Sequence, residues 1–255
     1  MLAIFKREFL SYFRSPVGFV AIAIFSFLSG FIFYSMFSQG VANIGSEVIS
    51  LRSFFVIIVP IITMGLLAED KKRGTDILYY TTPVSLFNVV AGKVLAAFAL
   101  YAVMFVNVII HIIVALACGG TFSVGSAGTI IVFFFMAFMF ISIGLFASAI
   151  TDNQIVSAIV SFIIILISQI LSVIASYIGT AFTSIVSTVG FDVEAASTAG
   201  NTVKSIICWF DPFAKTQDFQ LGIFSVSALI FLVSIGILFL YLTFRVLEKK
   251  RWSQA

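Results

Sequence analysis

Six apolar stretches, each close to the length of a membrane-crossing helix, dominate this sequence. The hydrocarbon core of a bilayer is about 30 Å thick and takes roughly 20 helical residues to cross. The stretches cover residues 17–38, 53–68, 87–117, 127–150, 155–181 and 222–244. Only 10% of the 255 residues are charged, against about 25% in soluble domains. The sequence therefore predicts an all-α integral membrane protein with six transmembrane helices, folded as a single transmembrane domain over residues 1–255.

Lysine and arginine are distributed unevenly between the segments that join these spans. If the N-terminus is placed in the cytoplasm, the inner segments hold eleven basic residues and the outer segments hold three. The inner set is Lys6, Arg7, Arg14, Lys71, Lys72, Arg73, Lys93, Arg245, Lys249, Lys250 and Arg251, and the outer set is Arg52, Lys204 and Lys215. Because basic residues gather in short cytoplasmic loops, both termini are expected in the cytoplasm. The net charge of +3 is thus a topology signal and gives no reason to expect nucleic-acid binding.

Residues 1–15 precede the first span and alternate apolar and basic side chains at helical spacing. The apolar set is Leu2, Phe5, Phe9 and Phe13, and the basic set is Lys6, Arg7 and Arg14. This pattern predicts a helix that lies in the membrane interface and enters the first span at Pro16. A simple membrane anchor is the alternative interpretation.

The densest cluster of charges lies between the second and third spans, in residues 69–85. Gly74 can end one helical turn, Thr75 can cap the next, and Asp76 is favourable in the first turn of a helix. We therefore expect a short cytoplasmic helix at the membrane surface. A solvated basic loop, which many membrane proteins carry, is the alternative.

The longest outer segment covers residues 182–221. Its middle is small and polar, and we expect a short interfacial helix after it, with Trp209 and Phe210 at the level of the lipid headgroups. The acids of this segment form no catalytic pair and are expected to be solvated; they are Asp192, Glu194, Asp211 and Asp218. Cys118 and Cys208 lack metal-ligand spacing and are either free thiols or a disulfide.

Polar residues inside two spans suggest either packing or a pathway. Small residues recur on one face of the fifth span, namely Ser157, Ser161, Ser168, Ser172, Ser176 and Gly179. Such a face favours close helix packing, and it also fits a subunit interface or a substrate route. The single histidine, His111, lies mid-span without an acidic partner in its own span. It is either a hydrogen-bonded structural residue or part of a proton relay.

The chain carries no recognisable ATP site of its own. Its one Gly-Lys pair is Gly92-Lys93, but Phe87 occupies the first glycine position of a phosphate-binding loop and Val94 follows the lysine. No residues show the spacing of metal ligands. We therefore expect no catalytic residue, cofactor or metal in this chain.

Four stretches carry a resemblance to a known family. They are IFKREFLSYFRSPVG, IIVPIITMGLLAEDKKRGTDILYYTTPVS, VAGKVLAA and LYLTFRVLEKKRW, in this order along the chain. With them the chain resembles the permease subunits of type-2 ABC transporters, and most closely the subgroup that contains the gliding-motility permease GldF. The resemblance covers about a third of the residues, and the second stretch is its most specific part.

The resemblance implies a role for the loop between the second and third spans. In the family this loop contacts a separate ATPase, here through residues 69–82. The implied coupling residues are Glu69, Asp70, Gly74, Thr75, Asp76 and Tyr79, and the charged part of the interfacial helix is Lys6, Arg7 and Glu8.

The function implied by the resemblance is that of a permease subunit of an ATP-driven exporter in the bacterial cell membrane. Its expected partners are ABC ATPase subunits, which bind ATP and Mg²⁺, a second permease copy or a related permease, and an accessory membrane or extracytoplasmic subunit. The alternative is an ATP-independent scaffold or secondary carrier that anchors an extracytoplasmic partner. Co-purification with an ATPase would separate the two.

Overall fold

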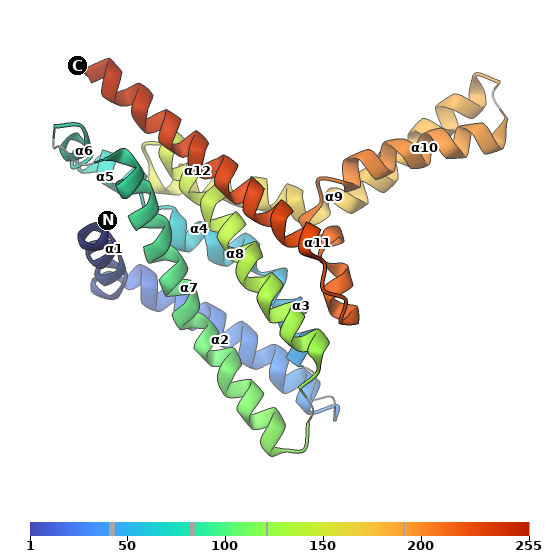
Figure 1. Ribbon diagram of the computed structural model, residues 1–255, viewed down its shortest axis with the longest axis horizontal. Helices are drawn as coiled ribbons and strands as arrows, with labels where there is room; N and C mark the ends of the chain where they lie inside the picture. Colours follow the sequence, from blue (N-terminus) through green and yellow to red (C-terminus); the bar gives the residue numbers. More distant parts are fainter. Residues whose placement is uncertain (41–43, 82–84, 121, 191, 255) are drawn as a thin grey trace.

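The computed structural model describes residues 1–40, 44–81, 85–120, 122–190 and 192–254, which form helices and turns without a β-strand. The helices are α1 (Leu2–Arg14), α2 (Pro16–Phe37), α3 (Ile44–Arg52), α4 (Phe55–Thr63), α5 (Ala68–Lys72), α6 (Ile77–Thr81), α7 (Leu86–Ala117), α8 (Val124–Ile150), α9 (Gln154–Thr188), α10 (Val193–Cys208), α11 (Pro212–Lys215), the 3₁₀ helix η1 (Gln217–Leu221) and α12 (Val226–Gln254). The predicted all-α class is confirmed. Both ends of the chain lie at the end of the bundle that carries α5 and α6 (Figure 1). We call this the basic end.

Among the described residues, five single helices are long and apolar enough to cross a membrane: α2, α7, α8, α9 and α12. Two further helical segments, Ile44–Arg52 and Phe55–Lys72, are long and apolar enough only when taken together, and they meet at an angle of 62°, as in a broken span or a re-entrant loop. Counted as one span, this pair gives the six that hydropathy predicts. It is bent, whereas the other five are continuous helices.

The chain is already helical before residue 53, where hydropathy predicts the start of the second span. The helical path begins at Ile44, and Arg52, which the sequence places in an outer segment, is buried at the bend. Its Nη1 atom donates a hydrogen bond to Thr216 Oγ1 at 3.0 Å. Gln169 Nε2, on α9, donates to the carbonyl of Ser53 at 2.8 Å. These partners reduce the cost of polar groups at the bend, and hydropathy alone cannot detect them.

The outer segment 182–221 is also more helical than the sequence predicts. Helix α9 continues to Thr188, and α10 packs back along it as one helix of 16 residues in place of a polar stretch and a short interfacial helix. This hairpin projects away from the rest of the bundle (Figure 1). Gly179 and Gly200 permit the close approach, because a Cβ on Gly200 would lie 2.5 Å from the carbonyl oxygen of Gly179.

The prediction that Asp211 is solvated is also wrong, because this side chain is buried. Its Oδ1 atom accepts hydrogen bonds from the amides of Phe213 at 2.8 Å and Ala214 at 3.1 Å, which caps α11. The other acids of the outer segment, Asp192, Glu194 and Asp218, are exposed as expected. The cysteines are free thiols.

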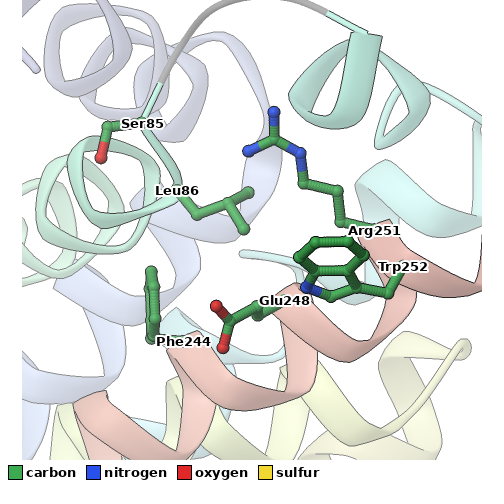
Figure 2. Close-up of a pocket in the computed structure, with 6 residues that line it drawn as sticks. All are labelled: Ser85, Leu86, Phe244, Glu248, Arg251 and Trp252. Carbon is green, nitrogen blue, oxygen red and sulfur yellow. The ribbon is translucent and has the colours of Figure 1, made fainter. Parts of the chain in front are cut away.

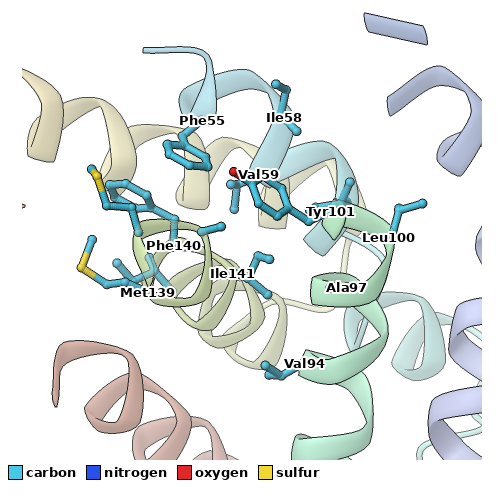
Figure 3. Close-up of a cluster of buried hydrophobic side chains, with 14 of the residues drawn as sticks. Phe55, Ile58, Val59, Val94, Ala97, Leu100, Tyr101, Met139, Phe140 and Ile141 are labelled. Carbon is cyan, nitrogen blue, oxygen red and sulfur yellow. The ribbon is translucent and has the colours of Figure 1, made fainter. Parts of the chain in front are cut away.

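The core lies where α4, α7 and α8 meet (Figure 3). Phe55 of α4 stacks on Tyr101 of α7, with ring centroids 5.9 Å apart, and lies 4.9 Å from Phe133 and 5.4 Å from Phe140 of α8. All four rings are fully buried. Aromatic pairs at these distances are favourable beyond the burial of their area. The short helix α4, which leads into the loop at the basic end, is thereby fixed to two long spans.

Candidate functional site

A tight turn connects α5 to α6 at the basic end. Gly74 has a φ of +68°, a conformation that costs little only for glycine. The amide of Gly74 bonds to the carbonyl of Lys71 at 3.1 Å, and that of Thr75 bonds to the carbonyl of Asp70 at 2.9 Å. This is the Schellman pattern of helix termination. Gly74 therefore ends α5 as the sequence predicts and reverses the chain into α6.

Lys93 of α7 has no exposed surface and is the centre of a charged cluster beneath this turn. Its Nζ atom lies 2.6 Å from Asp70 Oδ2 and 3.0 Å from Glu8 Oε1, and it also donates to the carbonyl of Leu66. A buried ammonium group is very costly unless it is paired and hydrogen-bonded. The cluster therefore holds α1 and α5 against a membrane-spanning helix.

Asp70 gathers further hydrogen bonds from the loop itself. The hydroxyl of Tyr79 donates to Oδ2 at 2.6 Å, and the hydroxyl of Thr75 donates to Oδ1 at 3.1 Å. Arg7 Nη2 in turn donates to the Tyr79 hydroxyl at 2.7 Å. Burial alone would raise the pKa of Asp70, but the charge and hydrogen bond of Lys93 outweigh it and hold this pKa below its ordinary value. Asp70 is therefore ionised and joins α5, α6 and α7.

The same loop and the two residues before it are also bonded to the end of α8. The amides of Leu67 and Ala68 both donate to Ser148 Oγ at 2.9 Å. Lys71 Nζ donates to the carbonyl of Thr151 at 2.9 Å, where the negative end of the α8 dipole favours a cation. Because α1, α7 and α8 all bond to one loop, displacement of the loop must displace or break its contacts with three helices.

The predicted coupling residues divide into an inner and an outer group. Asp70 and Tyr79 face the bundle, whereas Glu69 forms an ion pair with Arg73, whose side chain is 70% exposed. Leu78 on α6 is exposed as well. The inner residues thus position the loop, and the outer residues form the surface that a partner could touch.

A groove of about 440 Å³ runs between α1 and this outer surface. Arg7 and Arg14 line it from α1, and Glu69, Arg73 and Leu78 line it from the loop. Of the three charged residues predicted on the interfacial helix, Lys6 and Arg7 are exposed and Glu8 is buried against the bundle. The groove therefore offers both signs of charge beside an exposed apolar residue.

The small-residue face of α9 lies apart from this cluster. Ser161 is buried, and Ser168, Ser172 and Ser176 are half-buried. Each hydroxyl of Ser161, Ser168 and Ser176 donates to a carbonyl four residues earlier in its own helix, at 2.9–3.0 Å. The role of this face as an interface or pathway stays a prediction.

His111 has an acidic partner that the sequence did not reveal. Its Nδ1 atom lies 2.7 Å from Oε1 of Glu47, which is buried on α3, and Ser29 Oγ donates to the same oxygen at 2.8 Å. Phe33 stacks on the imidazole with ring centroids 4.3 Å apart. Glu47 escaped notice because α3 was assigned to an outer loop. The structural and proton-relay interpretations of His111 both stay open.

Sequence reasoning missed Lys93 and Ser148 as parts of the site. Lys93 was counted only as an inner basic residue, although an ionisable side chain within an apolar span is itself a functional signal. Ser148 had no such signal, because a single serine in a span is common. In the described part of the chain, no three His, Cys, Asp or Glu side chains are placed to hold a metal ion.

One protein-family model, described as ABC-2 family transporter protein, matches residues 2–252 of the chain. The match is to the family as a whole and does not distinguish the GldF-like subgroup. Among curated proteins none matches the chain.

Proposed function

The chain belongs to the ABC-2 transporter family, and we propose that it is a permease subunit through which a separate ATPase drives export across the bacterial cell membrane. Membership supports a multi-pass membrane protein that works with an ABC ATPase subunit and a second permease. In more detail, we propose that residues 69–82 contact the ATPase and transmit its movement to the permease. In this proposal, residues 69–82 and both termini lie in the cytoplasm.

The buried contact between Lys93 and Asp70 is the observation that carries this proposal. It joins the loop to α7, while Lys71 joins the loop to the end of α8 through the carbonyl of Thr151. An ATPase that pushed the loop would therefore exert force on α7 and α8 together. A bundle with two alternative packings would convert such a push into opening or closing of a pathway. The permease transmits the movement, and the ATPase subunits bind ATP and Mg²⁺.

The groove between α1 and the loop is the proposed docking surface for the ATPase. Interfaces combine an apolar centre with a polar rim, and here the exposed Leu78 lines the same groove as the charged side chains of Arg7, Arg14 and Arg73. One ATPase subunit would dock on each of two permeases, the second being a copy of this chain or a related chain. An accessory subunit, where present, would add to this assembly.

Co-expression of the chain with its ATPase tests the docking surface. Leu78→Glu places a charge in the proposed interface, so we expect loss of co-purification and of the ATPase stimulation that the permease causes. Leu221→Glu is the matched control, because Leu221 is 77% exposed and lies on η1, away from the basic end (Figure 1).

Equal co-purification and stimulation for the two variants would exclude the loop as the docking surface. A chain that purifies without any ATPase and transports without ATP would instead support the scaffold or secondary-carrier alternative. Gel filtration in mild detergent shows whether each variant keeps the native size, which separates lost docking from lost folding.

A further inference from the structure

Two hollows lie where α7 and α12 approach each other, and α8 also lines the smaller one. The larger hollow is at the basic end (Figure 2). It encloses about 490 Å³. Leu86 at the beginning of α7 and Phe244, Arg251 and Trp252 near the end of α12 line it, and their side chains face a common space (Figure 2). The lining is thus an apolar wall with a guanidinium group and an indole at its mouth.

The charges at this mouth favour an anion. Glu248 also lines the hollow, but its carboxylate lies 2.6 Å from Arg245 Nη1 and is neutralised by it. Within the described chain, no carboxylate lies within ion-pair distance of Arg251. Ser85, the N-cap of α7, lines the same hollow, so the positive end of the α7 dipole is close by. One basic side chain is therefore free to bind a negatively charged group.

The second hollow lies deeper along α7 and α12, has α8 as its third wall and is wholly apolar. Its volume is about 300 Å³, and it is lined by Phe98 of α7, Val233 of α12 and three residues of α8, Phe134, Phe135 and Phe138. Phe98 is twelve residues beyond Leu86, which is about 18 Å along α7 at a rise of about 1.5 Å per residue. One leaflet of the hydrocarbon core is about 15 Å deep. The spacing of the two hollows thus matches the depth of one leaflet.

We propose that the seam between α7 and α12 binds a phospholipid with an anionic headgroup. Arg251 binds the headgroup phosphate, Trp252 lies at the interface, and one acyl chain extends to the hollow lined by phenylalanines. Basic pockets between transmembrane helices on the cytoplasmic side bind anionic headgroups, and tryptophan favours the membrane interface. The inference takes from the proposed function only the cytoplasmic placement of the basic end. An ATPase segment in the larger hollow is the outcome that would compete with it.

Fluorescence of Trp252 tests the lipid site in the full-length chain. The chain has two tryptophans, so Trp209→Phe leaves Trp252 as the only reporter. Phospholipids with brominated acyl chains quench indole on contact. We expect brominated phosphatidylglycerol to quench Trp252 at an about fivefold lower lipid fraction than brominated phosphatidylcholine, because one basic residue contributes about this factor toward anionic lipid.

Two variants and a control test whether the lipid binds at Arg251 and in the deeper hollow. Arg251→Gln should abolish the preference for phosphatidylglycerol, whereas Lys72→Gln removes the same charge from an exposed position outside the hollow and should keep it. Val233→Phe fills the deeper hollow and should weaken binding of both lipids. Equal quenching by the two lipids, or an equal effect of the Lys72 and Arg251 variants, would overturn the proposal.

The comparison of the two lipids needs no change to the hollow itself, so it decides the matter even if Arg251→Gln fails to fold. The measurement also needs no ATPase. A preference for anionic lipid without ATPase stimulation would support the lipid site and contradict the proposed function. ATPase stimulation without a lipid preference would support the proposed function and contradict the lipid site. If added ATPase, rather than lipid, protects Trp252 from quenching and no lipid preference is seen, the hollow is a protein-docking site.

Discussion

The ammonium group of Lys93 lies 2.6 Å from the carboxylate of Asp70, which is 23 positions earlier in the chain, and Lys93 is entirely buried. A charge in this position is stable only with its partners. Lys93 therefore makes the attachment of the loop to α7 obligatory, and variants at this pair should reveal the attachment directly.

Lys93→Met should lower the free energy of unfolding by about 3 kcal/mol, because Asp70 and Glu8 lose a buried counter-charge. Asp70→Asn should cost less, since Lys93 keeps Glu8. The double variant should be less destabilised than the sum of the two, because neither charge of the pair is then left alone. Thermal and denaturant unfolding in detergent measure these differences. Simple additivity would show that the two side chains do not interact in solution.

The pKa of Asp70 gives a prediction for the effect of acid on the charged cluster. Its pKa is lowered in the folded chain, where burial opposes and Lys93 favours ionisation. The ionised carboxylate therefore contributes stability above its ordinary pKa of 3.8, and this contribution is lost as the pH falls through the lower folded value. The gap in unfolding temperature between the native chain and Asp70→Asn should be constant from about pH 5 to 8 and close below about pH 4. A gap that closes near neutral pH would contradict this assignment.

The turn should require glycine at position 74 because of the backbone conformation there, and not because a side chain would clash. Nothing lies within 4 Å of a Cβ built on Gly74, so the strain in Gly74→Ala comes from its φ of +68°, and about 1 kcal/mol of destabilisation is expected. Gly74→Asn should be milder, because asparagine tolerates this conformation. Gly30→Ala is the control, since that position also has open space but lies within α2. If the two alanine variants unfold alike, the turn is not strained.

Hydropathy predicted the bounds of α2, α7 and α8 to within three residues because each is apolar along its length. Helix α12, Val226–Gln254, continues ten residues beyond the predicted end at residue 244, through a charged segment that hydropathy does not assign to a span. Hydropathy failed at α3, where Glu47 and Arg52 made residues 44–52 resemble a loop. Both side chains are buried in the folded chain, where His111 and Thr216 are their partners from distant positions. The charged residue is visible in the sequence, but its partner is distant along the chain and cannot be identified there. A segment that carries a buried charged residue is therefore mistaken for a solvent-exposed loop.

The candidate site was predicted only in part for the same reason. The turn at Gly74 follows from local rules, and it could be located from the sequence. Lys93, Glu8 and Asp70 come from three helices, and their meeting depends on tertiary packing. The length of α10 was missed because its small polar residues are typical of loops until Gly179 and Gly200 bring two helices together.

The pair of His111 and Glu47 gives a prediction that separates its two interpretations. His111→Leu removes the imidazole from buried Glu47, which keeps the Ser29 hydroxyl as a donor, and should lower the free energy of unfolding by about 1–3 kcal/mol. Adding Glu47→Gln should restore part of that loss, because the charge is removed. If His111 is structural, His111→Gln should leave transport unchanged between about pH 5 and 8. A loss of pH dependence in His111→Gln with unaltered stability would support the proton relay.

Labelling of single cysteines tests the orientation on which the coupling proposal depends. Cys118 is exposed and follows α7 at the end of the bundle away from α5 and α6 (Figure 1), so a membrane-impermeant maleimide should label it on intact cells carrying Cys208→Ser. Lys72→Cys in a chain without other cysteines should be labelled only after the cells are opened, because basic loops stay in the cytoplasm. Gel filtration in mild detergent shows whether Lys72→Cys keeps the native size, which separates a change of orientation from unfolding. If Lys72→Cys reacts on intact cells, the loop faces outward, and no cytoplasmic ATPase could push the cluster at Lys93.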